Sequence, residues 1–193
     1  MKQFNKYERK EQVEFELLPK GAYVIKLLSV KEEFPKDKDI SYLKMAFDIA
    51  EGEYKDFYKR AFENNTKEDK KWPNDAVIYL TVPTDNSEQW LIDNFNKFMT
   101  AVEDSNKDYH WNWDENTLKD KLVGAKFNIE QSEFDGKIYD HTKAKWFIAA
   151  QKVRDGKFGK LPQDKLLTNN HSTSSSSPAN DGFVPIPAEE IPF

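Results

Sequence analysis

Aromatic and cationic side chains occur together at several places along this chain of 193 residues. Tyr42 and Lys44 occupy alternate positions of one apolar-polar stretch, and Trp72 directly follows two lysines in a charged loop. Rings offer surfaces on which nucleobases stack, and lysine and arginine follow phosphates, so this combination is typical of proteins that bind single-stranded nucleic acid. The candidate contact residues are Tyr42, Lys44, Lys55, Tyr58, Lys59, Arg60, Trp72, Lys143, Lys145 and Trp146.

Each candidate ring has a simpler alternative role, which is packing in a core or over the mouth of a barrel. Between residues 54 and 62 both faces of a strand would carry rings, so the sequence leaves open which face points outward. Isolated lysines and arginines are usually solvated, so only their clustering supports a site. We assign four other rings to the core: Phe47, Phe95, Phe98 and Phe127.

Catalytic chemistry finds little support in the sequence. The three histidines, His110, His141 and His171, are scattered and no pair has metal-ligand spacing. The chain has no cysteine, which removes disulfides and thiolate chemistry, and it contains no glycine-rich phosphate loop. Carboxylate pairs such as Glu68-Asp69 have the composition of a solvated surface. We therefore expect a binding protein without enzyme activity, metal or cofactor.

Charge is distributed unevenly along the chain. The net charge is −5, which does not favour a partner that is a polyanion. Residues 84–120 carry three lysines against nine acidic residues, a balance of −6, whereas residues 137–160 carry seven cations against two carboxylates, a balance of +5. The local field decides where a polyanion docks, so the second segment permits nucleic-acid binding.

Hydrophobic periodicity predicts a mainly β fold with a helical insert. Residues 40–49 alternate apolar and polar side chains, which indicates a half-buried antiparallel strand. Asp85 and Glu88 resemble a capping pair before a helix, a second short helix is expected at Asp114, and Asp135-Gly136 suits a hairpin turn. The predicted strands are residues 22–30, 40–49, 54–62, 76–82, 123–131 and 143–153.

This order of elements matches an oligonucleotide-binding (OB) fold, a five-stranded Greek-key barrel with its helix between strands three and four. Other small barrels and α+β sandwiches accept the same order. We expect the barrel domain to span residues 1–160.

The composition changes after Gly159. Residues 161–180 include a run with five serines and are expected to form a flexible polar linker. Residues 181–193 form an acidic, apolar tip that we expect to bind other proteins, because a terminal ring with flanking carboxylates fits an apolar pocket with a basic rim. The expected partner contacts are Asp181, Glu189, Glu190, Ile191, Pro192 and Phe193.

The ending Glu189-Glu190-Ile191-Pro192-Phe193 resembles the tip of bacterial single-stranded-DNA-binding proteins. The stretches Leu18–Tyr23 and Phe47–Tyr54 look more like the variants that bacteriophages and mobile elements encode. The resemblance implies a protein that coats single-stranded DNA during replication, recombination or repair. It also implies a tail that docks on helicases, primases or recombination mediators. The body departs from the cellular proteins, so the oligomeric state does not carry over, and a homo-oligomer is compatible with the sequence.

Two rival functions stay open at this point. One is an adaptor whose barrel binds a protein instead of DNA, and the other is a nuclease-like accessory enzyme that holds magnesium with carboxylates. Residues 1–20 lack an apolar signal region and no stretch is long enough to span a membrane, so we expect a cytoplasmic location and no membrane partner.

Overall fold

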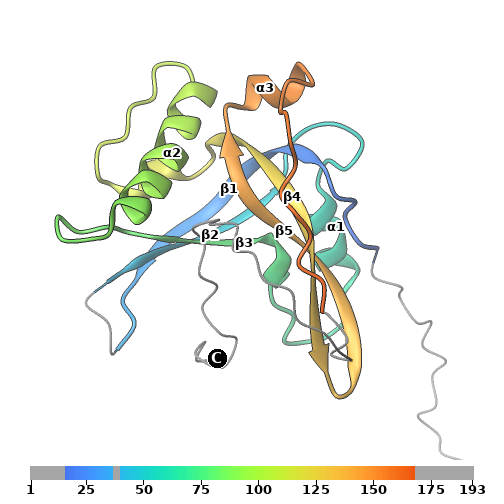
Figure 1. Cartoon of the computed structure of the whole chain (residues 1–193). Helices are drawn as coiled ribbons and strands as arrows, with labels where there is room; N and C mark the ends of the chain where they lie inside the picture. Colours follow the sequence, from blue (N-terminus) through green and yellow to red (C-terminus); the bar gives the residue numbers. More distant parts are fainter. Residues whose placement is uncertain (1–15, 37–39, 168–193) are drawn as a thin grey trace, which may run out of the picture.

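The fold is built on one five-stranded antiparallel sheet. A computed structural model describes residues 16–36 and 40–167. The strands are β1 (Ala22–Glu33), β2 (Tyr42–Ile49), β3 (Val77–Thr81), β4 (Leu122–Phe134) and β5 (Lys137–Ile148). Their order in the sheet is β3-β2-β1-β4-β5, so β1 lies in the middle and β3 and β5 form the two edges (Figure 1).

Three α-helices and two 3-10 turns accompany the sheet. α2 (Gln89–Ser105) lies between β3 and β4 in the chain, which confirms the predicted helical insert. The shorter elements are α1 (Phe57–Asn64), η1 (Asn74–Ala76), η2 (Glu115–Leu118) and α3 (Ala150–Arg154). In the part of the chain that the structure describes, no helix combines the length and apolar character that a membrane crossing requires.

The alternation of β2 produces the core. Leu43, Met45, Phe47 and Ile49 are buried on one face of the strand, as predicted. α2 adds Phe95 and Phe98 to the same core, and β4 adds Phe127, which confirms all four ring assignments. The Phe98 ring lies 4.8 Å from that of Phe147 on β5, so α2 is packed on the sheet by edge-to-face aromatic contact.

Residues 54–62 do not form the predicted third strand. They form a turn and then α1, and the third strand of the sheet is β3. The Asp48 carboxylate, which is buried on β2, accepts hydrogen bonds from the backbone N–H groups of Ile49, Tyr58 and Lys59 at 2.8 to 3.0 Å. Two of these donors belong to the first turn of α1, where N–H groups have no partner within the helix. Asp48 therefore caps the helix from a neighbouring strand.

The last hairpin has the predicted turn, but its final strand begins at Lys137 instead of residue 143. Asp135 and Gly136 both have positive φ values, 51° and 68°, as a two-residue type I′ turn requires. β5 ends at Ile148 instead of residue 153, and α3 follows it. α3 lies so close to β4 that a Cβ on Gly124 would come within 2.7 Å of Val153 Cγ2. The glycine is needed there for close packing.

The described domain extends beyond its predicted end at residue 160. The Lys165 N–H donates to the Ile129 carbonyl and the Lys165 carbonyl accepts from Gln131 N–H, both at 2.9 Å. Asp164 accepts from the Ile129 N–H and forms a 2.8 Å ion pair with Lys20. These contacts, the backbone bond first, hold the pKa of Asp164 below its usual value. Residues 161–167 are therefore attached to β4, and the rest of the predicted linker and the tip lie outside the described residues.

We expect Asp48→Ala to destabilise the domain. The substitution leaves three backbone donors without their acceptor, two of them at a helix start, and a cost of about 2 kcal/mol in the free energy of unfolding follows. Urea denaturation measures this change. Asp48→Asn keeps one acceptor oxygen and should cost less, and equal stability of the alanine variant and the wild type would show that the cap is not needed.

Candidate nucleic-acid interface

The outward face of β2 and β3 brings two tyrosines and a lysine together. In the strand register Lys44 lies opposite Tyr79, and Tyr42 lies opposite Thr81. The Tyr42 and Tyr79 rings are 5.5 Å apart in an edge-to-face arrangement, and Lys44 Nζ lies 5.9 Å from the centroid of the Tyr79 ring. The Tyr79 side chain is 49 % exposed. We call Tyr42, Lys44 and Tyr79 the aromatic platform.

Tyr79 is the member of the platform that our sequence analysis missed. Its strand alternates like β2: Ile78 and Leu80 are buried, and Tyr79 between them is exposed. That alternation is visible in the sequence, so the signal was present.

Glu33 on β1 orders the platform. Tyr42 donates its hydroxyl hydrogen bond to Glu33 Oε2 at 3.0 Å, and Lys44 Nζ lies 3.5 Å from Glu33 Oε1. Burial, followed by this hydrogen bond and the Glu33 charge, raises the pKa of Tyr42. Lys44 is therefore partly neutralised, and a phosphate that approached it would compete with Glu33.

Asp75 of η1 connects the two edges of the sheet. Its carboxylate lies 2.8 Å from Lys143 Nζ and 3.1 Å from His141 Nδ1, and both of these residues belong to β5. Lys143 Nζ also donates to the Asn74 carbonyl at 3.3 Å, and His141 Nε2 lies 2.8 Å from Ser132 Oγ. We call Asp75, His141 and Lys143 the edge bridge. Lys143, which we predicted to contact DNA, therefore forms an ion pair within the protein.

Trp146 and Lys145 lie apart from the aromatic platform. Trp146 is 46 % exposed and Lys126 Nζ lies 5.7 Å from its ring centroid, while Lys145 pairs with Glu130 at 2.8 Å. Trp146 is opposite Lys126, which is opposite Ala22 at the start of β1. Tyr42 is opposite Glu33 at the end of β1, so the two groups are separated by the length of that strand.

Four of the predicted DNA contacts lie on α1 or just before it instead of on a strand. Tyr58 is 4 % exposed and its ring packs against Phe47 and Phe57. Burial raises its pKa, and the ring is not accessible to a nucleobase, which corrects our prediction for this residue. Three predicted contacts remain exposed near or on α1, off the sheet: Lys55, Lys59 and Arg60.

Trp72 fits the core-packing alternative. It is partly buried, packs against the core and lies 5.7 Å from the Phe62 ring of α1. Its indole Nε1 is buried and finds no acceptor among the described residues.

Two hairpins extend from the sheet. Figure 1 shows the β1–β2 and β4–β5 hairpins projecting toward the same side of the molecule. The β4–β5 hairpin exposes three apolar side chains that the sequence analysis did not select: Phe134 at 74 %, Ile138 at 50 % and Tyr139 at 44 %.

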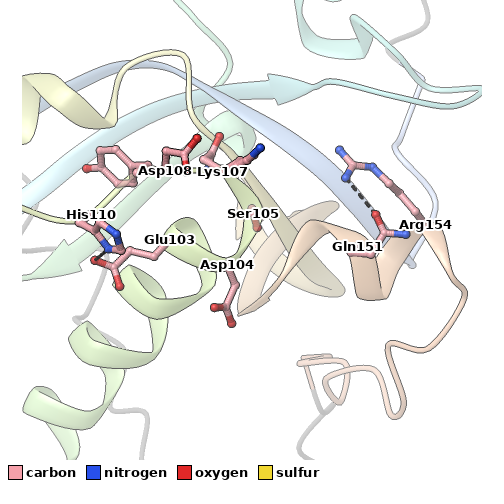
Figure 2. Close-up of a pocket in the computed structure, with 10 residues that line it drawn as sticks. Glu103, Asp104, Ser105, Lys107, Asp108, His110, Gln151 and Arg154 are labelled. Atoms are coloured by element: carbon pink, nitrogen blue, oxygen red, sulfur yellow. Dashed lines mark hydrogen bonds and ion pairs between the residues drawn. The ribbon is translucent and has the colours of Figure 1, made fainter.

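A polar hollow of the surface lies elsewhere, at the end of α2 (Figure 2). It encloses about 410 Å³, and its walls include Glu103, Asp104, Asp108 and His110. Lys107 and Arg154 also line it, so carboxylates and cations share its walls. Across the described ranges, no group of side chains is arranged to hold a metal ion.

The predicted tail contacts, Asp181 and Glu189 to Phe193, lie outside the described residues. Comparison with models of protein families and with curated proteins finds no match to this chain.

We expect Asp75→Asn to weaken the contact between the sheet edges. The substitution removes the negative charge that holds Lys143 and His141, and because all three side chains are partly exposed, the expected loss is about 1 kcal/mol in the free energy of unfolding. Urea denaturation measures it. Glu63→Gln is the matched control, because its 4.0 Å pair with Lys59 is 59 % exposed on both sides. If both substitutions lower the free energy of unfolding by the same amount, the edge bridge contributes no more than an exposed ion pair.

Proposed function

We propose that this protein binds and coats single-stranded DNA with little sequence preference. The observation that carries the proposal is the aromatic platform, in which two rings and a lysine lie side by side on the outward face of β2 and β3. Tyrosine rings accept any base by stacking, and lysine attracts the phosphate.

The proposal includes an OB fold. In that fold the first strand pairs with the second and the fourth, and oligonucleotides bind across strands two and three, between the loops that follow strands one and four. The strand order β3-β2-β1-β4-β5 agrees with this scheme, and the edge bridge joins β5 to η1, the turn that leads into β3. In an OB fold the outward face of β2 and β3, with the aromatic platform, would form part of the binding face.

Binding should be moderate and sensitive to salt. Lys31 lies opposite Lys44 in the register, which adds a second cation to the platform, while Glu33 offsets part of the charge. Counterion release contributes in proportion to the number of phosphates that are neutralised. With few cations at the face, stacking has to supply a large share of the affinity.

The proposed biological setting rests on the resemblance of the tail. A coating protein of a phage or mobile element would act in replication, recombination or repair of its DNA. The acidic tip, Glu189 to Phe193, would recruit a helicase, a primase or a recombination mediator. This role requires no catalysis and no cofactor.

A second candidate function is a protein-interaction adaptor. The exposed apolar side chains of the β4–β5 hairpin and the net charge of −5 favour it, since both suit a protein partner. An adaptor would show no affinity for oligonucleotides and would retain a stable protein partner.

Tyr79→Ala should weaken binding of oligo-dT about tenfold or more, because a base that stacks on an aromatic ring gains roughly 1–3 kcal/mol. Fluorescence anisotropy of a labelled oligonucleotide measures the dissociation constant. Tyr79→Phe is the control, since it keeps the ring and should bind like the wild type. Unchanged affinity of the alanine variant would remove the platform from the binding site.

Deletion of residues 181–193 should strengthen binding to oligo-dT at low salt. The tip is acidic and, in our proposal, competes with DNA for cationic side chains when no partner protein is present. The same anisotropy titration, run at low and high salt, should show a difference that shrinks as salt rises. An equal or weaker affinity of the shortened chain would contradict this competition.

A further inference from the structure

Three aromatic rings that do not belong to the aromatic platform meet beside α2. The ring centroid of Phe95 on α2 lies 6.0 Å from that of Trp113, and the two ring planes are nearly parallel. The centroid of the Trp111 ring lies 6.3 Å from that of Phe95 and 6.0 Å from that of Trp113. Phe95 is buried, whereas Trp113 is 73 % exposed. We call these three rings the tryptophan cluster.

The loop that carries the cluster is held in a defined conformation. Trp113 has a φ of 66°, which bulky residues rarely adopt. Trp111 N–H donates to Glu103 Oε1 at 2.7 Å, and Asp114 N–H donates to Asn112 Oδ1 at 3.2 Å. A large exposed ring in an unfavourable backbone conformation, fixed by hydrogen bonds on both sides, is a feature to explain by function.

The charge around the cluster selects the chemistry of its ligand. The cluster belongs to residues 84–120, whose balance is −6, so nucleic acid is repelled. The complementary ligand is a peptide segment in which aromatic side chains alternate with cations, because rings pack on the tryptophans and cations meet the carboxylates.

The chain itself contains such a segment. Lys2 to Lys10 holds Phe4 and Tyr7 among four cations, Lys2, Lys6, Arg9 and Lys10, against one carboxylate, Glu8. These residues lie outside the described part of the chain, as do the following five. We propose that residues 2–10 of one copy bind the tryptophan cluster of a second copy.

The position of the nearest described residues favours a second copy over folding back on the same one. Leu18 accepts a hydrogen bond from Thr142 of β5, and Lys20 pairs with Asp164. Figure 1 shows this start of the described chain on the side of α1, and α2 with its following loop on the opposite side. A segment that leaves on one side and a receptor on the other side produce a head-to-tail contact between copies.

A head-to-tail contact uses two different surfaces, so it extends into an open array unless the rotation closes a ring. An array of this kind suits a protein that covers a polymer, because each bound copy assists the next. This consequence for cooperativity rests on the proposed function, whereas the self-association itself does not require DNA.

Sedimentation velocity of the full chain without DNA tests the contact. The wild type should associate as its concentration rises, and Trp113→Ala should lower the association constant about tenfold. Lys2→Glu with Lys6→Glu should do the same. Adding Glu115→Lys, two residues after Trp113, to that pair should restore part of the association, since a cation then faces the new carboxylates.

Three outcomes overturn the proposal. A wild type that stays monomeric, or a Trp113→Ala variant that associates normally, removes the contact. Loss with Trp113→Ala but not with the lysine variants assigns the cluster to a different segment or partner. A titration with an oligo-dT short enough to hold one copy separates this proposal from the proposed function. If neither the wild type nor any variant binds the oligonucleotide, the proposed function is refuted. If Trp113→Ala binds it normally but no longer self-associates, the contact is supported. Thermal melting by circular dichroism checks that each variant is folded.

Discussion

The two unpaired edges of the sheet are the constraint on which the arrangement depends. β3 and β5 each have one side without a strand partner in the described sheet, and exposed edges of this kind invite wrong pairing. Asp75 connects them by holding Lys143 and His141 of β5 from the turn before β3. The bridge therefore ties the turn before one edge strand to the other edge strand. The aromatic platform lies on the outward face of β2 and β3.

The separation of charge along the chain corresponds to a separation of surfaces. The acidic residues 84–120 form α2 and its following loop, which carry the tryptophan cluster and the polar hollow. The platform belongs to a different part of the fold, where Lys31 lies opposite Lys44. A net charge of −5 therefore describes neither surface, and an acidic protein can offer a face that accepts a polyanion.

Local patterns in the sequence predicted what local forces determine. The alternation of β2, the Asp135-Gly136 turn and the helix after Glu88 were all predicted, because each depends on neighbours in the chain. The helix at residues 57–64 was not predicted, since its cap comes from Asp48, about ten residues earlier on another strand. The burial of Tyr58 follows from that helix. The separation of Trp146 from Tyr42 depends on the register of the strands. The positions of rings and cations in the sequence do not determine that register.

Fluorescence anisotropy of labelled oligo-dT and of a duplex of equal length, each at low and at high salt, tests the central claim most directly. The proposed function predicts tighter binding of the single strand, with an affinity that falls as salt rises but is not abolished, because stacking on Tyr42 and Tyr79 persists. Equal binding of duplex and single strand, or no binding of either by folded protein, would contradict it.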